Sequence, residues 1–117
     1  MASTHNEPER LALDDPRRRG ILIPASQLVD TGLAVGDRFS VKRGQKELFA
    51  VLIVKDAQGD ILYDRAGIFI ERTRRVDMFL GGVFDTFRVE FRAGDPPALC
   101  IRPLDVNIKG IEKIIRP

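Results

Sequence analysis

The chain has little of what most catalytic and metal sites are built from. Its 117 residues include one histidine, one cysteine and no tryptophan. Transition metals are held by clusters of cysteine and histidine, and His5 stands alone in a polar first stretch. No glycine-rich loop of the kind that cradles phosphate is present. We therefore predict no catalytic residue, no metal site, no cofactor and a protein that is not an enzyme.

Long apolar runs are missing as well. No run approaches the roughly 18 residues that span a membrane, and the first sixteen residues lack the apolar core of a secretory signal. The single cysteine, Cys100, excludes an internal disulfide and fits a reducing compartment. It lies in the apolar run PALCI, so it is expected to be a buried small hydrophobic residue. These absences predict a cytoplasmic protein with no membrane partner.

Net charge is small, at +2, but it is unevenly distributed. Residues 1–16 carry a net charge of −3, whereas residues 17–92 hold fourteen basic against ten acidic residues. A basic body is compatible with a polyanionic partner, and equally with a solvated surface of mixed charge. The length suits one core. We expect residues 1–16 to form a flexible acidic leader and residues 17–117 to form a single barrel domain.

An internal repeat indicates the fold. Shifting the chain by 47 residues aligns six identities within the window 20–33, where unrelated sequences would share about one. After one inserted residue near 81–84 the shift becomes 48. The matching positions are Gly20 and Gly67, Ile21 and Ile68, Ile23 and Ile70, Val29 and Val76, Asp30 and Asp77, Leu33 and Leu80, then Asp37 and Asp85, Phe39 and Phe87, Val41 and Val89. We interpret this pattern as a duplication, with repeat one at about 17–64 and repeat two at about 65–117.

Each copy has the pattern of a strand, a short helix and a strand pair. The runs GILI and GIFI predict strands, and Pro24 suits the first turn of a helix over 25–31. The second helix is expected over 72–79. Alternating runs around Phe39 and Phe87 predict half-buried strands, and 48–54 and 97–101 predict strands that are apolar on both faces. One or two short strands are expected within 106–117.

Two such units can close into a barrel that removes free strand edges. The predicted fold is therefore mostly β with short helices: a small, pseudo-twofold β-barrel of two strand–helix–strand–strand repeats. The strand at 48–54 would favour a homo-oligomer if its second face were exposed.

One segment of the first copy resembles a known DNA-binding element. RRRGILIPASQLVDTGLAVGDRFSVKR is similar to the AbrB-type swapped-hairpin unit, through Arg19, Gly20, Ile23-Pro24, Leu33 and Gly36-Asp37. LYDRAGIFIERTRRVDMFLGG resembles the second copy in MraZ-like regulators, which carry two such units in one chain. The resemblance covers about residues 13–92. It implies a barrel of the swapped-hairpin, cradle-loop or double-psi type and a transcriptional regulator that binds double-stranded DNA.

The cations that match the family's binding positions flank the two predicted strand–helix junctions. Arginine suits phosphate and guanine because its planar fork donates two hydrogen bonds at once. The candidate DNA-binding residues are Arg17, Arg18, Arg19, Arg65, Arg72, Arg74 and Arg75.

Two further features bear on the function. Asp30 and Asp77 repeat between the copies, but their place late in a short helix favours a local hydrogen bond over a paired-carboxylate site. A DNA reader should present basic residues from both copies on one face, whereas the first helix begins with the uncharged PASQL. The alternative is a non-enzymatic protein-interaction or assembly module on the same barrel, such as an antitoxin-like or adaptor domain.

Overall fold

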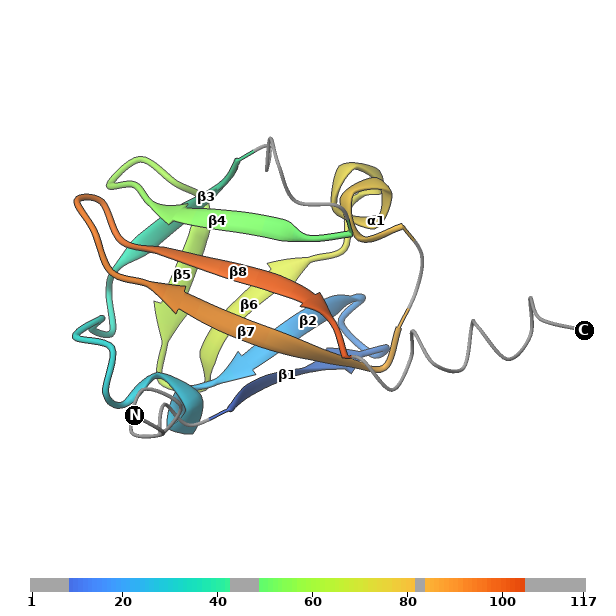
Figure 1. The fold of residues 1–117 in the computed structure, drawn as a ribbon, viewed down its shortest axis with the longest axis horizontal. Helices are drawn as coiled ribbons and strands as arrows, with labels where there is room; N and C mark the ends of the chain where they lie inside the picture. The colour runs from blue at the N-terminus through green and yellow to red at the C-terminus, as the bar shows by residue number, and fades with distance from the viewer. Residues whose placement is uncertain (1–8, 43–48, 82–83, 105–117) are drawn as a thin grey trace, which may run out of the picture.

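The strands of the protein form one antiparallel barrel that closes on itself. The computed structural model describes residues 9–42, 49–81 and 84–104. Around the barrel the order is β1-β2-β6-β5-β3-β4-β8-β7, so every described strand has two neighbours (Figure 1). The predicted small, mostly β barrel is confirmed. Its elements are β1 (Arg10–Asp15), β2 (Gly20–Pro24), the 3-10 helix η2 (Ala25–Leu28), β3 (Arg38–Lys42), β4 (Val51–Lys55), β5 (Ile61–Asp64), β6 (Gly67–Glu71), α1 (Arg74–Leu80), β7 (Thr86–Arg92) and β8 (Ala98–Pro103).

Strand register shows the pseudo-twofold symmetry directly. In the β2–β6 ladder Leu22 lies opposite Phe69, which is its own counterpart at a shift of 47. In the β4–β8 ladder Leu52 lies opposite Cys100, its counterpart at a shift of 48. A pseudo-twofold axis therefore crosses the barrel wall at these two pairs. It relates β1–β4 to β5–β8, which places the division between the two halves at the turn after β4.

One part of the expected leader belongs to the barrel. Residues 10–15 form β1, which pairs with β2 on one side and β7 on the other. Ala12 points inward and is fully buried, while Leu13 on the outer face is half exposed. The expectation of a flexible leader over 1–16 is wrong for residues 10–15. The four acidic residues of the segment 1–16 favoured a solvated leader over the short alternating pattern of a strand. Residues 1–8 lie outside the described residues.

Side chains that alternate along the strands fill the barrel. Phe39 and Phe87, counterparts in the two halves, are fully buried and are the largest of these side chains. Isoleucines of β2 and β6 pack beside them. Cys100 is also fully buried, as expected, although it belongs to the outer face of β8, where Arg102 covers its sulfur. Apolar side chains of both halves thus form one shared core.

The two expected helices differ in kind. Residues 25–31 were expected to be helical, but only a four-residue 3-10 helix forms, η2, and its N-cap Pro24 offers no side-chain acceptor. In α1 the Thr73 hydroxyl accepts a hydrogen bond from the Val76 N–H, and Gly81 ends the helix with φ of 78°. A capped start and a left-handed glycine stop favour an α-helix. The sequence difference between the copies therefore decides the helix type.

The strand expected as an assembly surface is enclosed. β4 is hydrogen-bonded to β3 and β8, so neither of its edges is available to a second chain. Its outward side chains, Leu52 and Val54, are half-buried. Residue 48 and the strands expected within 106–117 lie outside the described residues. Among the described helices, none has the length and apolar character needed to cross a membrane.

Candidate nucleic-acid interface

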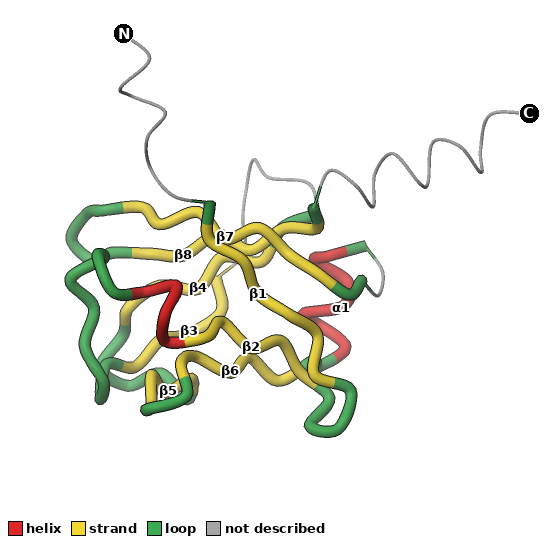
Figure 2. The backbone as a smooth tube through the Cα atoms, turned by 90° about the horizontal axis from the view of Figure 1, so that it is seen from below, coloured by secondary structure: helices red, strands yellow, loops and turns green. Residues whose placement is uncertain are grey.

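Each strand–helix junction is joined to the hairpin turn of the other half. The Arg72 N–H donates to the Arg19 carbonyl at 2.9 Å, and the equivalent Ala25 N–H donates to the Ala66 carbonyl at 3.0 Å. We call the first junction the arginine corner, made of residues 16–19 and 72–75. We call the second the neutral corner, made of residues 25–28 and 65–66. Figure 2 shows η2 and α1 at opposite ends of the barrel, so the two corners are well separated.

The arginine corner gathers six of the seven predicted DNA-binding residues. Arg17, Arg18 and Arg19 form the turn between β1 and β2, and Arg72, Arg74 and Arg75 lead into α1. Arg65 lies instead in the turn between β5 and β6, at the neutral corner. β6 has five residues, which at about 3.3 Å each separates Arg65 from Arg72 by about 16 Å or more. Arg65 cannot contact the same few phosphates as the other six.

Arg72 lies between β1 and α1 and is largely buried. Its side chain is 11% exposed and forms ion pairs with Asp14 of β1 and Asp77 of α1. The Nε–Oδ1 distance to Asp77 is 3.1 Å. These contacts tie β1 to the helix and leave the guanidinium largely enclosed. We therefore assign Arg72 to holding the corner together. Sequence reasoning placed Asp14 in a leader, so it could not have found this pair.

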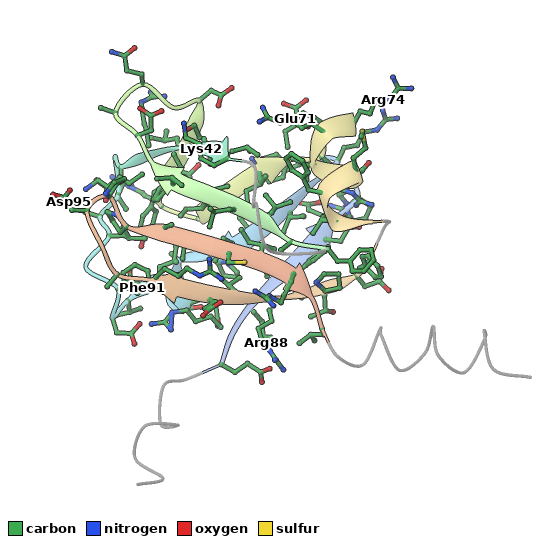
Figure 3. The ribbon with its side chains drawn as sticks, turned by 45° about the horizontal axis from the view of Figure 1, so that its top comes forward. Lys42, Glu71, Arg74, Arg88, Phe91 and Asp95 are labelled. Atoms are coloured by element: carbon green, nitrogen blue, oxygen red, sulfur yellow. The ribbon has the colours of Figure 1, made fainter. Side chains whose placement is uncertain are left out.

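The other five arginines of the corner are exposed. Within the described part of the chain, no ion pair engages their guanidinium groups. Figure 3 shows Arg74 directed away from the barrel at the start of α1, with Glu71 beside it. Two acidic residues adjoin this corner: Glu71 is exposed, and Asp15 is half-buried and accepts a hydrogen bond from the Arg17 backbone N–H. Positive charge therefore predominates here.

Two of these arginines lie over aromatic rings. The Arg18 guanidinium carbon is 3.9 Å from the centre of the Phe69 ring, and that of Arg75 is 5.5 Å from the Phe79 ring. Phe69 lies on the outer face of β6, because the alternation Ile68, Phe69, Ile70 leaves the middle residue outside. This alternation is the sequence signal that could have placed a ring beside the arginines.

An open depression of about 440 Å³ lies between the turn and the helix. Asp14, Pro16, Arg19, Arg72 and Asp77 line it. Its two carboxylates are already paired with Arg72. The depression is therefore a mixed-charge hollow within the corner, and the exposed arginines stand around it.

Each of the two repeated aspartates forms an ion pair with an arginine, and the pair is local in sequence, as expected, for Asp77 but not for Asp30. Asp77 accepts from Arg72, while Asp30 pairs with the buried Arg10 of β1 at 2.8 Å. They belong to opposite corners, so they do not meet as a carboxylate pair. No group of three or more potential metal ligands occurs among the described residues.

Comparisons of the chain with protein-family models, with curated proteins and with solved structures find no match. The proposed function therefore rests on the geometry and charge of the arginine corner.

Proposed function

We propose that the protein binds duplex DNA through the arginine corner, as a transcriptional regulator of the AbrB or MraZ kind that its sequence resembles. One observation carries the proposal: five exposed guanidinium groups, from segments more than fifty residues apart, share one end of the barrel. DNA presents closely spaced phosphates, and guanidinium groups bind them with paired, charge-assisted hydrogen bonds.

The corner holds its two groups of arginines at a fixed spacing. The Arg72 ion pairs with Asp14 and Asp77 join β1 to α1, and the Arg72–Arg19 backbone bond joins the turn to the same point. A surface that is already ordered loses less conformational entropy on binding than a flexible one. Arg72 thus contributes to binding by positioning its neighbours.

The geometry favours a single DNA-binding corner in each barrel. The neutral corner presents Arg65 with an uncharged 3-10 helix, ASQL. A single chain therefore contacts one stretch of backbone, in place of the two symmetric stretches that a pair of basic corners would contact.

Fluorescence anisotropy of a mixed-sequence duplex, titrated at several salt concentrations, tests the proposal. If the five exposed arginines each neutralise one phosphate, log Kobs falls with log salt at a slope of about −4.5. The variant Arg17→Ala/Arg74→Ala/Arg75→Ala is expected to bind more weakly and to reduce the magnitude of the slope by about 3.

A matched control removes the same charge at the other end of the barrel. Arg38→Ala/Lys55→Ala/Arg65→Ala alters three basic residues that are exposed and outside the arginine corner. It is expected to keep nearly the affinity and slope of the unmodified protein. If both triple variants weakened DNA binding equally, the effect would be one of net charge and not of the arginine corner. Absence of binding at low salt by the folded protein would overturn the proposal.

One feature favours the alternative, a protein-interaction module. Leu13, Leu22 and Phe69 lie side by side on the outer face of β1, β2 and β6, and Leu62 of β5 extends this row. Leu13 is 50% exposed and Leu62 is 39% exposed. A row of apolar side chains on a barrel surface is typical of a protein contact. If the titration shows no binding, this row becomes the leading candidate surface.

A further inference from the structure

The Arg18–Phe69 pair is the closest of the cation–ring contacts in the described residues. Its separation of 3.9 Å compares with 5.5 Å for Arg75 and Phe79 and 5.9 Å for Arg10 and Phe91. At that distance the guanidinium lies over the ring, well inside the roughly 6 Å limit for a favourable interaction. Arg18 is nevertheless an exposed residue of the turn. The ring therefore constrains a side chain that faces solvent.

The backbone around the ring is arranged to receive it. Phe69 points outward from β6 opposite Leu22, and its ring lies against Gly20, the first residue of β2, two residues before Leu22. A Cβ on Gly20 would overlap the Phe69 ring and would lie 2.7 Å from the Ile70 carbonyl oxygen. The missing side chain at Gly20 lets the ring lie flat beside the turn that carries Arg18.

The other half of the barrel lacks this arrangement. The counterpart of Phe69 is Leu22, which has no ring. The turn that corresponds to 16–19 is the two-residue turn 65–66, with Arg65 as its single arginine. The stack thus occurs in the arginine corner and is not a general consequence of the repeated backbone.

A stacked arginine is suited to a different task from a freely moving one. Stacking occupies the face of the guanidinium, while its N–H groups lie in the plane and remain able to donate at the edge. Paired hydrogen bonds to O6 and N7 of guanine need a fork of fixed orientation, whereas phosphate accepts from many directions. Preorganisation is therefore of most use to an arginine that reads a base.

We infer that Arg18 is the arginine of the corner that contacts guanine in the major groove, and that Phe69 is the positioning residue that orients it. This inference rests on the proposed DNA-binding function. Arg17, Arg74 and Arg75, which are exposed at the same corner, then contact phosphate.

The test uses a pair of probes that differ in one acceptor. A short duplex is selected by the full-length protein from a randomised pool and then made with guanine or with 7-deazaguanine, which lacks N7 but keeps base pairing and phosphates. The unmodified protein is expected to bind the guanine duplex about tenfold more tightly. Arg18→Ala is expected to bind both duplexes equally.

Variants of Phe69 separate orientation from general stability. Leucine is accepted at the equivalent position 22, so Phe69→Leu is expected to fold, and urea unfolding verifies this. It should reduce the tenfold preference to about two- to fourfold, because loss of the cation–ring contact weakens binding of the guanine duplex by only a few fold. Phe69→Tyr keeps the ring and should restore the preference. Arg65→Ala, at the neutral corner, should leave it unchanged.

The possible outcomes are distinct. A preference that stays near tenfold in Phe69→Leu but vanishes in Arg18→Ala overturns the positioning role of Phe69. Equal binding of both duplexes by the unmodified protein overturns the guanine contact and leaves the phosphate contacts standing. No binding of either duplex overturns this inference together with the proposed function.

Discussion

The arginine corner and the neutral corner share a backbone hydrogen bond between turn and helix, but they differ in turn length, helix type and side chains. The hydrogen bonds that join turn to helix differ by 0.1 Å between them, at 2.9 and 3.0 Å. Yet one corner carries six arginines and the other carries one. The repeat supplies the same junction twice, and positive charge is concentrated at one of the two corners, each of which combines residues of both halves. In this barrel a shared hydrogen bond between turn and helix does not imply a shared surface chemistry.

The helices extend the contrast. Thr73 caps α1 through its hydroxyl, whereas Pro24 at the start of η2 has no such acceptor. The capped helix projects Arg74 and Arg75, and the uncapped one is a single 3-10 turn. A side-chain cap is thus present on the helix that presents cations and absent from the uncharged 3-10 turn.

The largest expected effect comes from the glycines that begin β2 and β6. Gly67 has φ of 133°, and a Cβ there would overlap the Ile23 carbonyl oxygen. Gly67→Ala is therefore expected to lower the free energy of unfolding by about 4 kcal/mol, from backbone strain and overlap combined. At Gly20 the nearest atoms belong to the Phe69 ring, so Gly20→Ala should cost about 2 kcal/mol. Urea unfolding measures both, and equal losses would show that the two glycines have equivalent surroundings.

The ion pairs of Arg72 provide the next largest effect. Arg72→Ala leaves Asp14, whose side chain is 13% exposed, without its partner. Removing one member of a buried pair typically costs 3–5 kcal/mol, and the partial exposure of Asp77 reduces the expected loss to about 3 kcal/mol. Arg65→Ala at the neutral corner is expected to change stability by less than about 0.5 kcal/mol. If the two variants had similar urea midpoints, the assignment of Arg72 as the residue that holds the corner together would be wrong.

The smallest of these effects concerns the helix cap. Thr73→Ala removes the acceptor for the Val76 N–H and is expected to cost about 1 kcal/mol. Ser26→Ala changes an exposed residue of η2 and is expected to cost less than about 0.5 kcal/mol. Thermal unfolding of the two variants compares them. A cost at Ser26 that matched the cost at Thr73 would contradict the contrast between the helices.

The repeat made most of the fold predictable from the sequence. Identities such as Ile21 with Ile68 and Phe39 with Phe87 located the strands, and the register confirms that Leu22 faces its own counterpart. The first strand was missed because Asp14 and Asp15 follow an alternation only four residues long. Local patterning is weak evidence for a strand whose burial depends on β7, more than seventy residues later.

The site was predicted less completely than the fold. Charge and spacing located the arginines, but they could not separate Arg65 from the rest, because that depends on which end of β6 each residue occupies. Nor could they assign Arg72 to an ion pair with Asp14, its partner 58 residues away. The ring beneath Arg18 required knowledge of which face of β6 points outward. Each gap concerns the direction of a side chain in three dimensions.

The order of strands around the barrel has a consequence for how the chain folds. Hairpins from the two halves alternate, so β1-β2 is separated from β3-β4 on both sides by strands of the second half. Neither half can complete a sheet of its own, and all four seams between halves join residues distant in sequence. Such non-local pairing slows folding. On the ribosome the first half must therefore wait for the second, and the barrel is expected to form in one late cooperative step after β8 has emerged.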